Sequence, residues 1–434
     1  MVTPGDAGEA FARVQDRSPR CVWLDGGGAR DWSRRRSILG WLDEDDVSLT
    51  YSAARREVTR HAGGRSEVVG DDPFTVLEAE LAAGSESDQW FGYFGYAARP
   101  DLPAAPDPAM PDAVWMRPSH VREFTHVTPD GGFGHLSGVA TPVKRRNHRS
   151  TGDSDAVGAP EDAIPADYAA AFASVQEHLH AGNSYEVNLT HRLRVENPLA
   201  PAAVYLRLRA LNPAPYAGFL QHDVEGARAW LLSSSPERYA LITGDRTLEA
   251  KPIKGTTPRN ALPDEDAAAR DRLAADPKFR AENLMIVDLL RNDLSLVCEV
   301  GSVEVPHLME VESYASVHQL VSTVCGRLRD DVTTVGALRS LFPAGSMTGA
   351  PKLRTMEIID EVEADPRGVY SGAFGWVSGD GRADLGVVIR SLATTGDGTY
   401  VLGTGGGIIV DSDPAEEYAE TRWKAARLLE ALRS

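Results

Sequence analysis

Three charged residues share one face of a helix that we expect over residues 415–433, at the C-terminal end of the sequence. Glu417, Glu420 and Lys424 are three and four positions apart, so their side chains project from the same side of that helix. Asp413, followed by proline, predicts where the helix begins. The shared face fits two interpretations: a solvent-exposed face with an ion pair between Glu420 and Lys424, or part of a site that binds a cation.

A further carboxylate, Glu282, lies at the start of the segment AlaGluAsnLeuMetIleValAspLeuLeuArgAsnAsp, whose dense apolar residues predict a buried helix over 280–290. A single glutamate on a buried helix is unfavourable unless it is paired, exposed or bound to a cation. Together, Glu282, Glu417 and Glu420 would suit magnesium, which prefers oxygen ligands. The sequence leaves open whether the two helices bring the three carboxylates together.

Two lysines and a glutamate are candidates for covalent and acid–base chemistry. Lys251 and Lys254 lie in GluAlaLysProIleLysGlyThrThrProArg, and Glu237 follows SerSerSerPro. A lysine beside proline and glycine is usually exposed, but a lysine in a desolvated pocket becomes a nucleophile as its pKa falls. Glu237 would act as a general acid if its surroundings raise its pKa.

Two segments rich in small residues limit the type of enzyme. The glycine-rich run 403–407 matches neither a phosphate-binding loop nor a dinucleotide fingerprint. It fits either close backbone packing in a strand or bare amides that approach an anion. Residues 343–352 lack the Gly-x-Ser-x-Gly turn, which argues against a serine hydrolase.

The pattern of helices and strands predicts an α+β fold. A helix begins at Pro165 and continues through Tyr168, Phe172, Val175 and Leu179, which have helical spacing. Gly-Asp-Gly turns connect neighbouring apolar runs directly, which favours antiparallel pairing over helical crossovers. The apolar runs that we expect as strands are 230–233, 303–306, 373–377, 387–392 and 400–403.

Composition divides the chain into three parts. Residues 1–136 mix short apolar runs with glycine and proline turns. Residues 137–164 are rich in charged residues, glycine and proline, and we expect them to be a linker. Residues 165–434 form the second structured region, which carries all the candidate catalytic residues.

Charge and cysteine content exclude several classes of protein. The formal net charge of −18 argues against a surface for nucleic acid or anionic lipid. The N-terminal residues show no secretory pattern, and no apolar run approaches the roughly 20 residues of a membrane helix. Cys21, Cys298 and Cys325 lack metal-ligand spacing and are expected to be buried free thiols. These features predict a cytoplasmic protein that binds neither nucleic acid nor membranes.

Several long motifs occur in the order found in one enzyme family. They are SerProGluArg, ProIleLysGlyThr, the segment that contains Glu282, HisGlnLeuValSerThrVal, SerMetThrGlyAlaProLys, and GlyGlyGlyIle followed by GluGluTyrAlaGluThr. Over residues 165–434 the sequence resembles the chorismate-binding enzymes, and residues 90–96 resemble the family's N-terminal part more loosely. The resemblance implies an α+β fold of sheets flanked by helices, with one active site in the C-terminal region.

The resemblance also implies roles for individual residues. Glu282 and Glu420 would be magnesium ligands, with Glu417 beside them, and Glu237 would be the acid that helps the ring-4 hydroxyl of chorismate leave. The residues implied to hold the two carboxylates of chorismate are Tyr370, Arg390, Lys424 and the amides of Gly405 and Gly407, with Ser346 nearby.

Two positions distinguish members of the family. Glu186 stands where the water-adding members carry a lysine, which disfavours isochorismate and salicylate synthesis. Lys254 stands where anthranilate synthases typically carry alanine, and it resembles the pattern of aminodeoxychorismate synthase component I. In that pattern the lysine attacks ring carbon 2 as the hydroxyl leaves carbon 4, and ammonia then enters at carbon 4. Such a lysine must lose its proton near neutral pH, so we expect its pKa to be lowered.

Two further positions depart from the family. Gln319 replaces a histidine that often precedes LeuValSer, with His318 adjacent, and Phe279 stands where anthranilate synthases carry a glutamate. Both departures weaken an anthranilate-type assignment. The alternatives that stay open are anthranilate synthase component I, a 2-amino-2-deoxyisochorismate synthase, and a subunit that has lost catalysis and only binds or regulates.

The resemblance implies chorismate as substrate and a partner subunit as the source of ammonia. No cysteine lies in the Gly-x-Cys-x-Gly turn of a glutamine amidotransferase, so that activity is expected on a separate chain. The sequence leaves open whether the product serves p-aminobenzoate and folate formation or a specialised aromatic pathway. Ser37 and residues 212–217, including Pro215 and Tyr216, resemble segments that hold tryptophan in related enzymes. An ordinary turn with core residues is the alternative for these segments.

Overall fold

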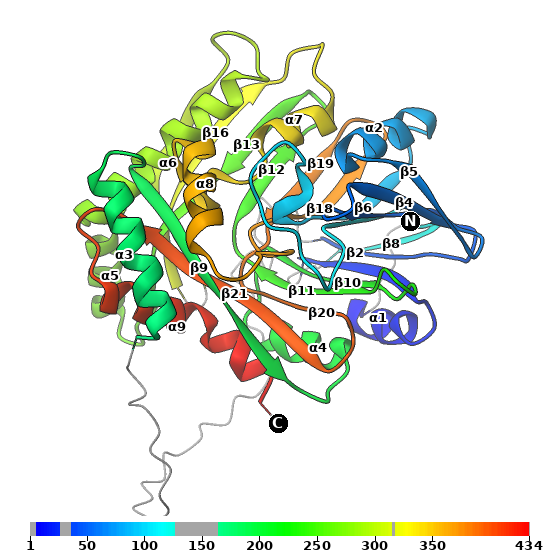
Figure 1. Cartoon of the computed structure of the whole chain (residues 1–434), viewed down its shortest axis with the longest axis horizontal. Helices are drawn as coiled ribbons and strands as arrows, with labels where there is room; N and C mark the ends of the chain where they lie inside the picture. The colour runs from blue at the N-terminus through cyan, green and yellow to red at the C-terminus, as the bar shows by residue number, and fades with distance from the viewer. Residues whose placement is uncertain (1–5, 27–35, 126–163, 315–316, 434) are drawn as a thin grey trace, which may run out of the picture.

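Two large antiparallel β-sheets form the centre of the molecule, and helices cover their outer faces (Figure 1). The computed structural model describes residues 6–26, 36–125, 164–314 and 317–433. Every strand pair within these ranges is antiparallel, as the direct turns between apolar runs predicted. The expected α+β class is confirmed.

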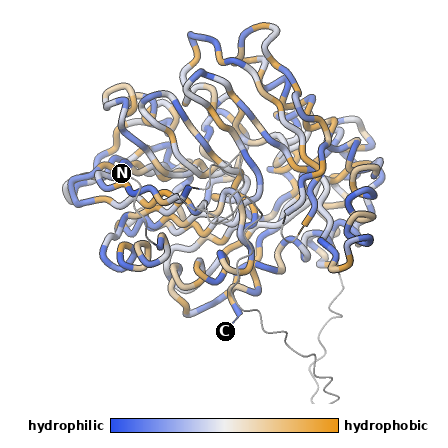
Figure 2. Tube along the Cα trace, turned by 180° about the vertical axis from the view of Figure 1, so that it is seen from behind, coloured by the Kyte–Doolittle hydropathy of each residue, from blue (hydrophilic) through white to orange (hydrophobic). Residues whose placement is uncertain are grey.

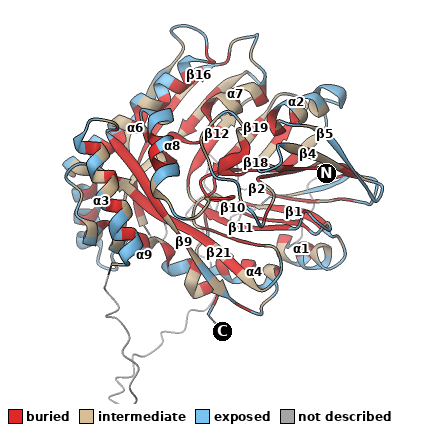
Figure 3. Ribbon diagram, viewed as in Figure 1, coloured by how far each residue is buried: buried red, intermediate tan, exposed pale blue. Residues whose placement is uncertain are grey.

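The first sheet has nine strands within the described residues, in the order β17-β9-β21-β20-β11-β10-β1-β2-β8. The strands are β1 Arg20–Asp25, β2 Arg36–Trp41, β8 His120–Thr125, β9 Glu186–Glu196, β10 Tyr216–His222, β11 Ala229–Ser235, β17 Gly349–Ala350, β20 Ser391–Thr394 and β21 Thr399–Ile408. The two long strands β9 and β21 are buried along most of their length (Figure 3).

The second sheet has twelve strands in the same described ranges, in the order β14-β16-β13-β12-β19-β18-β6-β7-β3-β4-β5, with β15 paired to β16 beside this path. The strands are β3 Ser48–Ser52, β4 Glu57–Ala62, β5 Arg65–Gly70, β6 Gln89–Phe94, β7 Ala113–Met116, β12 Arg238–Ile242, β13 Thr247–Lys251, β14 Ile253–Pro258, β15 Glu304–Ser313, β16 Val317–Arg327, β18 Ala373–Ser378 and β19 Ala383–Val387.

Nine α-helices and two short 3-10 turns complete the described chain. They are α1 Ala7–Gln15, α2 Pro73–Ala83, α3 Ala166–His180, α4 Pro201–Leu211, α5 Pro263–Ala275, α6 Pro277–Ser295, α7 Thr334–Leu341, α8 Lys352–Val362 and α9 Pro414–Ala431, with the turns η3 Tyr96–Ala98 and η4 Gly345–Met347. Hydrophilic and hydrophobic residues alternate along the peripheral helices, as expected for helices that cover a sheet on one side (Figure 2). None of the described helices combines the length and apolar character needed to cross a bilayer.

Buried hydrophobic residues divide the molecule into layers. One cluster joins the two sheets, with Val22 and Leu231 from the first packed among Phe91 and Phe374 from the second. A second cluster packs α2, α6 and α7 on the outer face of the second sheet. A third packs α1, α4 and α9 on the outer face of the first sheet. The layers follow the order helix, sheet, sheet, helix, and α6 and α9 nevertheless come into contact through Lys278 of α6 and Glu417 of α9.

The α3 helix follows the predicted pattern, because Tyr168, Phe172, Val175 and Leu179 are all buried. The predicted start of α9 is also confirmed. The Asp413 side chain accepts hydrogen bonds from the first backbone amides of this helix, which are otherwise without partners.

The boundary predicted at residue 136 does not separate two sheets. Strand β1 pairs with β10 in the first sheet, and β6 pairs with β18 in the second, so both sheets combine strands from the N-terminal region and the region 165–434. Of the predicted linker 137–164, residues 137–163 lie outside the described residues.

The predicted strand over 387–392 is wrong in its middle. Strand β19 ends at Val387 and β20 begins at Ser391, with Arg390 between them in the left-handed region at φ 51°. An apolar run carries no signal for a left-handed arginine, so periodicity alone reads through this break.

Candidate active site

Lys254, near the start of β14, lies at the junction of the two sheets. Its ammonium forms a hydrogen-bonded ion pair with Glu186, the first residue of β9, and lies 3.8 Å from Oε2 of Glu282 on α6. The Lys254 side chain is 11% exposed and that of Glu186 only 1%. The second oxygen of Glu186, Oε2, is buried without a hydrogen-bond partner among the described residues. The pair is therefore a buried charge cluster, and the lysine is not exposed.

The expected lowering of the Lys254 pKa is not found in this arrangement. Burial acts to lower the pKa, but the charges of Glu186 and Glu282 act in the opposite direction and outweigh it. The net result is a raised pKa. The amine can therefore become a nucleophile only if its proton passes to an acceptor in contact with it.

Glu237 lies beside this cluster, in the short connection between β11 and β12. The hydroxyl of Ser346, on η4, donates a hydrogen bond to Oε1 of Glu237 at 2.7 Å. Burial raises the pKa of Glu237 to about 7, against the lowering effects of the Ser346 hydrogen bond and of the charges of Lys254 and Lys424. With this pKa, Glu237 can carry a proton near neutral pH, as a general acid must.

The three predicted magnesium ligands lie on α6 and α9. A Cβ atom built on Gly406 of β21 would lie 3.2 Å from Oε2 of Glu417 and 3.9 Å from Oε1 of Glu420, so both carboxylates of α9 overlie this glycine. Burial raises the pKa of Glu282 to about 7, and the negative charge of Glu417 contributes to the rise. The fold therefore brings the three carboxylates into one electrostatic neighbourhood, which the sequence left open.

Lysines pair with the two carboxylates of α9. Lys278 Nζ is 3.0 Å from Oε1 of Glu417, and Lys424 Nζ is 2.6 Å from Oε1 of Glu420. In the described part of the chain, no three histidine, cysteine, aspartate or glutamate side chains are arranged to hold a metal ion as they stand. The oxygen donors suit magnesium, and Glu282 lacks full charge compensation, but binding would require at least one lysine to give way.

The glycine-rich run lies inside β21, and both of its predicted interpretations apply. Pairing with β20 stops at Leu402, so beyond that residue one edge of β21 has no strand neighbour in the described sheet. Lys424 Nζ donates to the Gly405 carbonyl at 2.8 Å. A Cβ on Gly407 would fall 2.1 Å from Oε1 of Glu186 and 3.1 Å from Lys254 Nζ. Glycine at 407 therefore makes room for the Lys254–Glu186 pair, beside backbone groups at an open strand edge.

Tyr370 lies where this open edge begins, at Gly403, and Arg390 is near it. A Cβ on Gly403 would be 2.2 Å from the Tyr370 ring, so the ring packs directly on the strand backbone. The Arg390 guanidinium stacks 5.1 Å from the Trp423 ring and forms no ion pair with a described residue. Burial lowers the Arg390 pKa, while Tyr370 and Glu420 act to raise it. A half-buried cation that forms no ion pair with a described residue is suited to an anionic ligand.

The fold thus brings together all the predicted catalytic, substrate and metal residues, and it adds residues that the sequence did not indicate. Arg367 donates to the backbone carbonyls of Met347 at 2.6 Å and Asn188 at 2.7 Å, and so fixes the turn that carries Ser346. The sequence could have indicated Lys278, because it lies four residues before Glu282 and therefore on the same face of α6.

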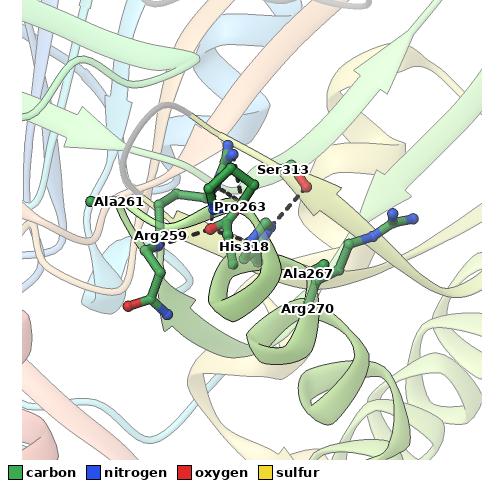
Figure 4. Close-up of a pocket in the computed structure, with 9 residues that line it drawn as sticks. Arg259, Ala261, Pro263, Ala267, Arg270, Ser313 and His318 are labelled. Atoms are coloured by element: carbon green, nitrogen blue, oxygen red, sulfur yellow. Dashed lines mark hydrogen bonds and ion pairs between the residues drawn. The ribbon is translucent and has the colours of Figure 1, made fainter.

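His318, on the neighbouring strand β16, contacts a different set of residues from Lys254. The ring lies between Ser313 Oγ at 2.8 Å and Asp266 Oδ1 at 3.1 Å, beside a cavity of about 420 Å³ at the start of α5 (Figure 4). Asp266 also forms an ion pair with Arg259 at 2.7 Å. The hydrogen bonds from Asp266 through His318 to Ser313 therefore connect α5 with β16 and β15. The neighbouring Gln319 is buried, and its Oε1 has no hydrogen-bond partner in the described structure.

A second cavity, of about 340 Å³, lies between the sheets at the predicted tryptophan segments. Pro215 and Tyr216 line it, together with Arg36 and Arg382. Ser37 does not line it: its hydroxyl accepts a hydrogen bond from the Gly26 amide at 3.0 Å and is buried. Two of the three predicted residues therefore face one amino-acid-sized space.

Comparisons with known proteins identify the family of the chain. Residues 20–430 match the family described as chorismate binding enzyme. An aminodeoxychorismate synthase of Streptomyces pristinaespiralis is 40% identical over 99% of this chain, but the chain spans only 64% of that relative's length. An aminodeoxychorismate synthase component 1 of Salmonella typhimurium is 35% identical, over 98% of this chain and 96% of its own. The crystal structure of anthranilate synthase component I from Streptococcus pneumoniae superposes with a TM-score of 0.70 at 26% identity, covering 91% of this chain and 92% of that one.

Proposed function

Because the chain belongs to the chorismate-binding enzyme family, we propose that it converts chorismate and ammonia to 4-amino-4-deoxychorismate, the reaction of an aminodeoxychorismate synthase component 1. The placement of Lys254 carries the proposal. Its amine is buried between Glu186 and Glu282, beside an acid, Glu237, whose pKa is about 7. A nucleophile and an acid of this kind are what a two-step displacement needs.

Chorismate would bind at the open edge of β21 as a dianion. The Arg390 guanidinium and the Lys424 ammonium supply positive charge there, and the amides of Gly405 and Gly407 supply uncharged donors. Tyr370, packed on Gly403, forms the wall next to Arg390. Glu282 and Glu420, with Glu417 beside them, would hold magnesium, which supplies charge that offsets a substrate carboxylate.

The covalent step begins with a proton transfer. Glu186 contacts the Lys254 ammonium and is the acceptor in position to take its proton. The neutral amine attacks ring carbon 2, the two conjugated ring double bonds shift, and the hydroxyl leaves carbon 4 as water with a proton from Glu237. Ammonia then adds at carbon 4, both double bonds shift back, and the lysine leaves carbon 2 as an amine that regains its proton from Glu186. Each step forms one carbon–nitrogen bond and breaks one bond to a leaving group, so a single difficult displacement is divided into two.

Ammonia would come from a glutamine amidotransferase subunit. All three cysteines are free thiols, as predicted, and Cys21 and Cys298 are buried, whereas Cys325 is half-buried. Burial raises the pKa of Cys21 to about 12, and those of Cys298 and Cys325 to about 11. A glutaminase nucleophile needs the opposite shift. Free thiols are typical of a reducing compartment, so we place the reaction in the cytoplasm, where the product would serve p-aminobenzoate and folate formation or a specialised aromatic pathway.

One assay distinguishes this reaction from its alternatives. The pure chain is incubated with chorismate, magnesium chloride and an ammonium salt, and products are identified by mass and ultraviolet spectrum. We expect the 4-amino isomer, and no turnover with glutamine in place of ammonium. Anthranilate with pyruvate, or the 2-amino isomer, would assign the chain to an alternative reaction. Absence of any product would favour a subunit that only binds or regulates.

The cavity lined by Pro215 and Tyr216 is proposed as a tryptophan-type site. Its volume suits one amino acid, and its arginine and acidic residues would pair with a carboxylate and an ammonium group. Saturating tryptophan should raise the thermal midpoint of the chain. No shift with tryptophan, together with unchanged activity, would remove this assignment.

A further inference from the structure

Lys278 occupies a position that the stability of its own helix does not explain. It is the second residue of α6, directly after Pro277. The N-terminal turn of a helix carries partial positive charge, so an acidic residue is favoured there and a lysine is not. The reason for this lysine must lie in its contacts with other elements.

Those contacts are with the carboxylates proposed as magnesium ligands. Lys278 Nζ lies 3.0 Å from Oε1 of Glu417, which is 3% exposed and also accepts a hydrogen bond from Ser412 Oγ at 2.8 Å. Burial acts to lower the pKa of Lys278, but the hydrogen bond and charge of Glu417 raise it, with further contributions from Glu282 and Glu420. A single ammonium therefore pairs with Glu417 and lies within the electrostatic influence of Glu282 and Glu420.

The side chain of Lys278 also has a route away from the cluster. It is 40% exposed, whereas Lys254 is 11% exposed. The four-carbon stem of a lysine can follow a protein surface while its head group reaches water. Lys278 can therefore leave Glu417 without any rearrangement of α6, and Lys254 cannot leave Glu186 in this way.

We propose that Lys278 is an exchangeable counter-ion of the magnesium site: its ammonium neutralises Glu417 when no metal is bound and swings to solvent when magnesium takes its place. The proposal rests on the magnesium site of the proposed function. A divalent cation and an ammonium repel one another, so they compete for the same carboxylate oxygen. The lysine would keep the buried carboxylates of Glu282 and Glu417 compatible with folding in the metal-free chain, and it would weaken magnesium binding until substrate carboxylates add to the site.

Calorimetric titration of magnesium chloride into the full chain, without chorismate, tests the exchange. Lys278→Met keeps the length of the stem and removes the charge. Because one competing charge is lost, we expect magnesium to bind about fivefold more tightly than to the wild type, which corresponds to the upper range for a partly exposed charge pair. The metal-free variant should also have a lower thermal midpoint than the wild type, and added magnesium should restore it.

The matched control is Arg427→Gln, which removes one positive charge from α9. Arg427 is 57% exposed, pairs with Glu430 at 2.6 Å, and lies ten residues, or about 15 Å, along the helix from Glu417. Its magnesium affinity should equal that of the wild type. Normal magnesium binding by the wild type, with unchanged or weaker binding by Lys278→Met, would overturn the counter-ion role alone. Failure of the wild type and both variants to bind magnesium, with or without chorismate, would contradict the metal site itself and the counter-ion with it.

Discussion

Replacing Lys254 by alanine should abolish the reaction and also destabilise the fold, and a second substitution should separate the two effects. The substitution leaves the Glu186 carboxylate in a place where its side chain is 1% exposed and where Oε2 already lacks a hydrogen-bond partner in the described residues. It also removes the nearest positive charge, at 3.8 Å, from Glu282. Removing one partner of a buried ion pair destabilises a protein by about 3–5 kcal/mol. We therefore expect Lys254→Ala to lower the free energy of unfolding by about this amount.

Adding Glu186→Gln should recover most of that loss, because a neutral amide replaces the unpaired buried charge and neutral replacement of a whole pair is often close to neutral in stability. Stability is measured by urea unfolding, and turnover by product formation from chorismate and ammonium. The double variant should unfold within about 1 kcal/mol of the wild type and still make no 4-amino product. Lys251→Ala, which breaks the Lys251–Glu312 pair of 2.6 Å and changes the last residue of the preceding strand β13, serves as the control and should keep the 4-amino product.

Two results would refute this reasoning. A loss below about 0.5 kcal/mol in Lys254→Ala is the behaviour of a surface residue and would contradict the buried charge cluster. Formation of the 4-amino product at a normal rate by the folded double variant would show that Lys254 is not the nucleophile. A slow 2-amino product, from direct attack of ammonia at carbon 2, is compatible with the mechanism.

Three further predictions concern other parts of the molecule. Because Glu237 must be protonated to act as an acid and its pKa is about 7, the turnover rate should fall as pH rises above about 7. Ser346→Ala removes the hydrogen bond that lowers this pKa, so the alkaline limb of the pH–rate profile should move to higher pH, and an unmoved limb would assign it to another group. Gly403→Ala places a methyl group 2.2 Å from the Tyr370 ring, so it should lower the free energy of unfolding by about 1–3 kcal/mol and weaken chorismate binding. The control is Gly244→Ala, where the nearest atom to the added methyl group is 3.9 Å away. It should change neither quantity in the same unfolding and binding assays. Burial lowers the pKa of His61 to about 4 and of His222 to about 3. Between pH 6.5 and about 4 the unfolded chain therefore binds protons that the folded chain does not. The free energy of unfolding should decrease as the pH is lowered through this range, by up to about 1.4 kcal/mol per pH unit for each histidine. His222→Gln should reduce that slope in urea unfolding between pH 7 and 5, and an equal slope would contradict it.

The parts of the fold that could be predicted from the sequence depend on local patterns. The spacing of Tyr168 and Leu179 predicted α3, and Asp413 predicted the start of α9, because helix periodicity and capping act within a few residues. The candidate site residues came from motifs whose order is characteristic of a family. Their types and positions were therefore available before any contact was known.

The pairings that decide the chemistry could not be predicted in the same way. Glu186 and Lys254 belong to strands of different sheets, and Lys278 and Glu417 to helices far apart in the chain, so no local pattern relates them. For the same reason the sign of the Lys254 pKa shift was wrong in the sequence-based expectation. Burial alone would lower it, but two carboxylates brought in by the fold raise it. The break at Arg390 was missed because an apolar run contains no mark of a left-handed residue.

The sharing of both sheets by distant segments has a consequence for synthesis on the ribosome. Strand β1, Arg20–Asp25, pairs on one side with Ala217–His222, and β6 pairs with β18 at Ala373–Ser378. The N-terminal strands leave the ribosome long before these partners exist, with hydrophobic faces and open edges that invite pairing with other nascent chains. The central layer can close only when nearly the whole polypeptide has been made. Folding of this protein should therefore be largely post-translational and dependent on chaperones that protect unpaired strands, and a fragment ending near residue 125 should not fold by itself.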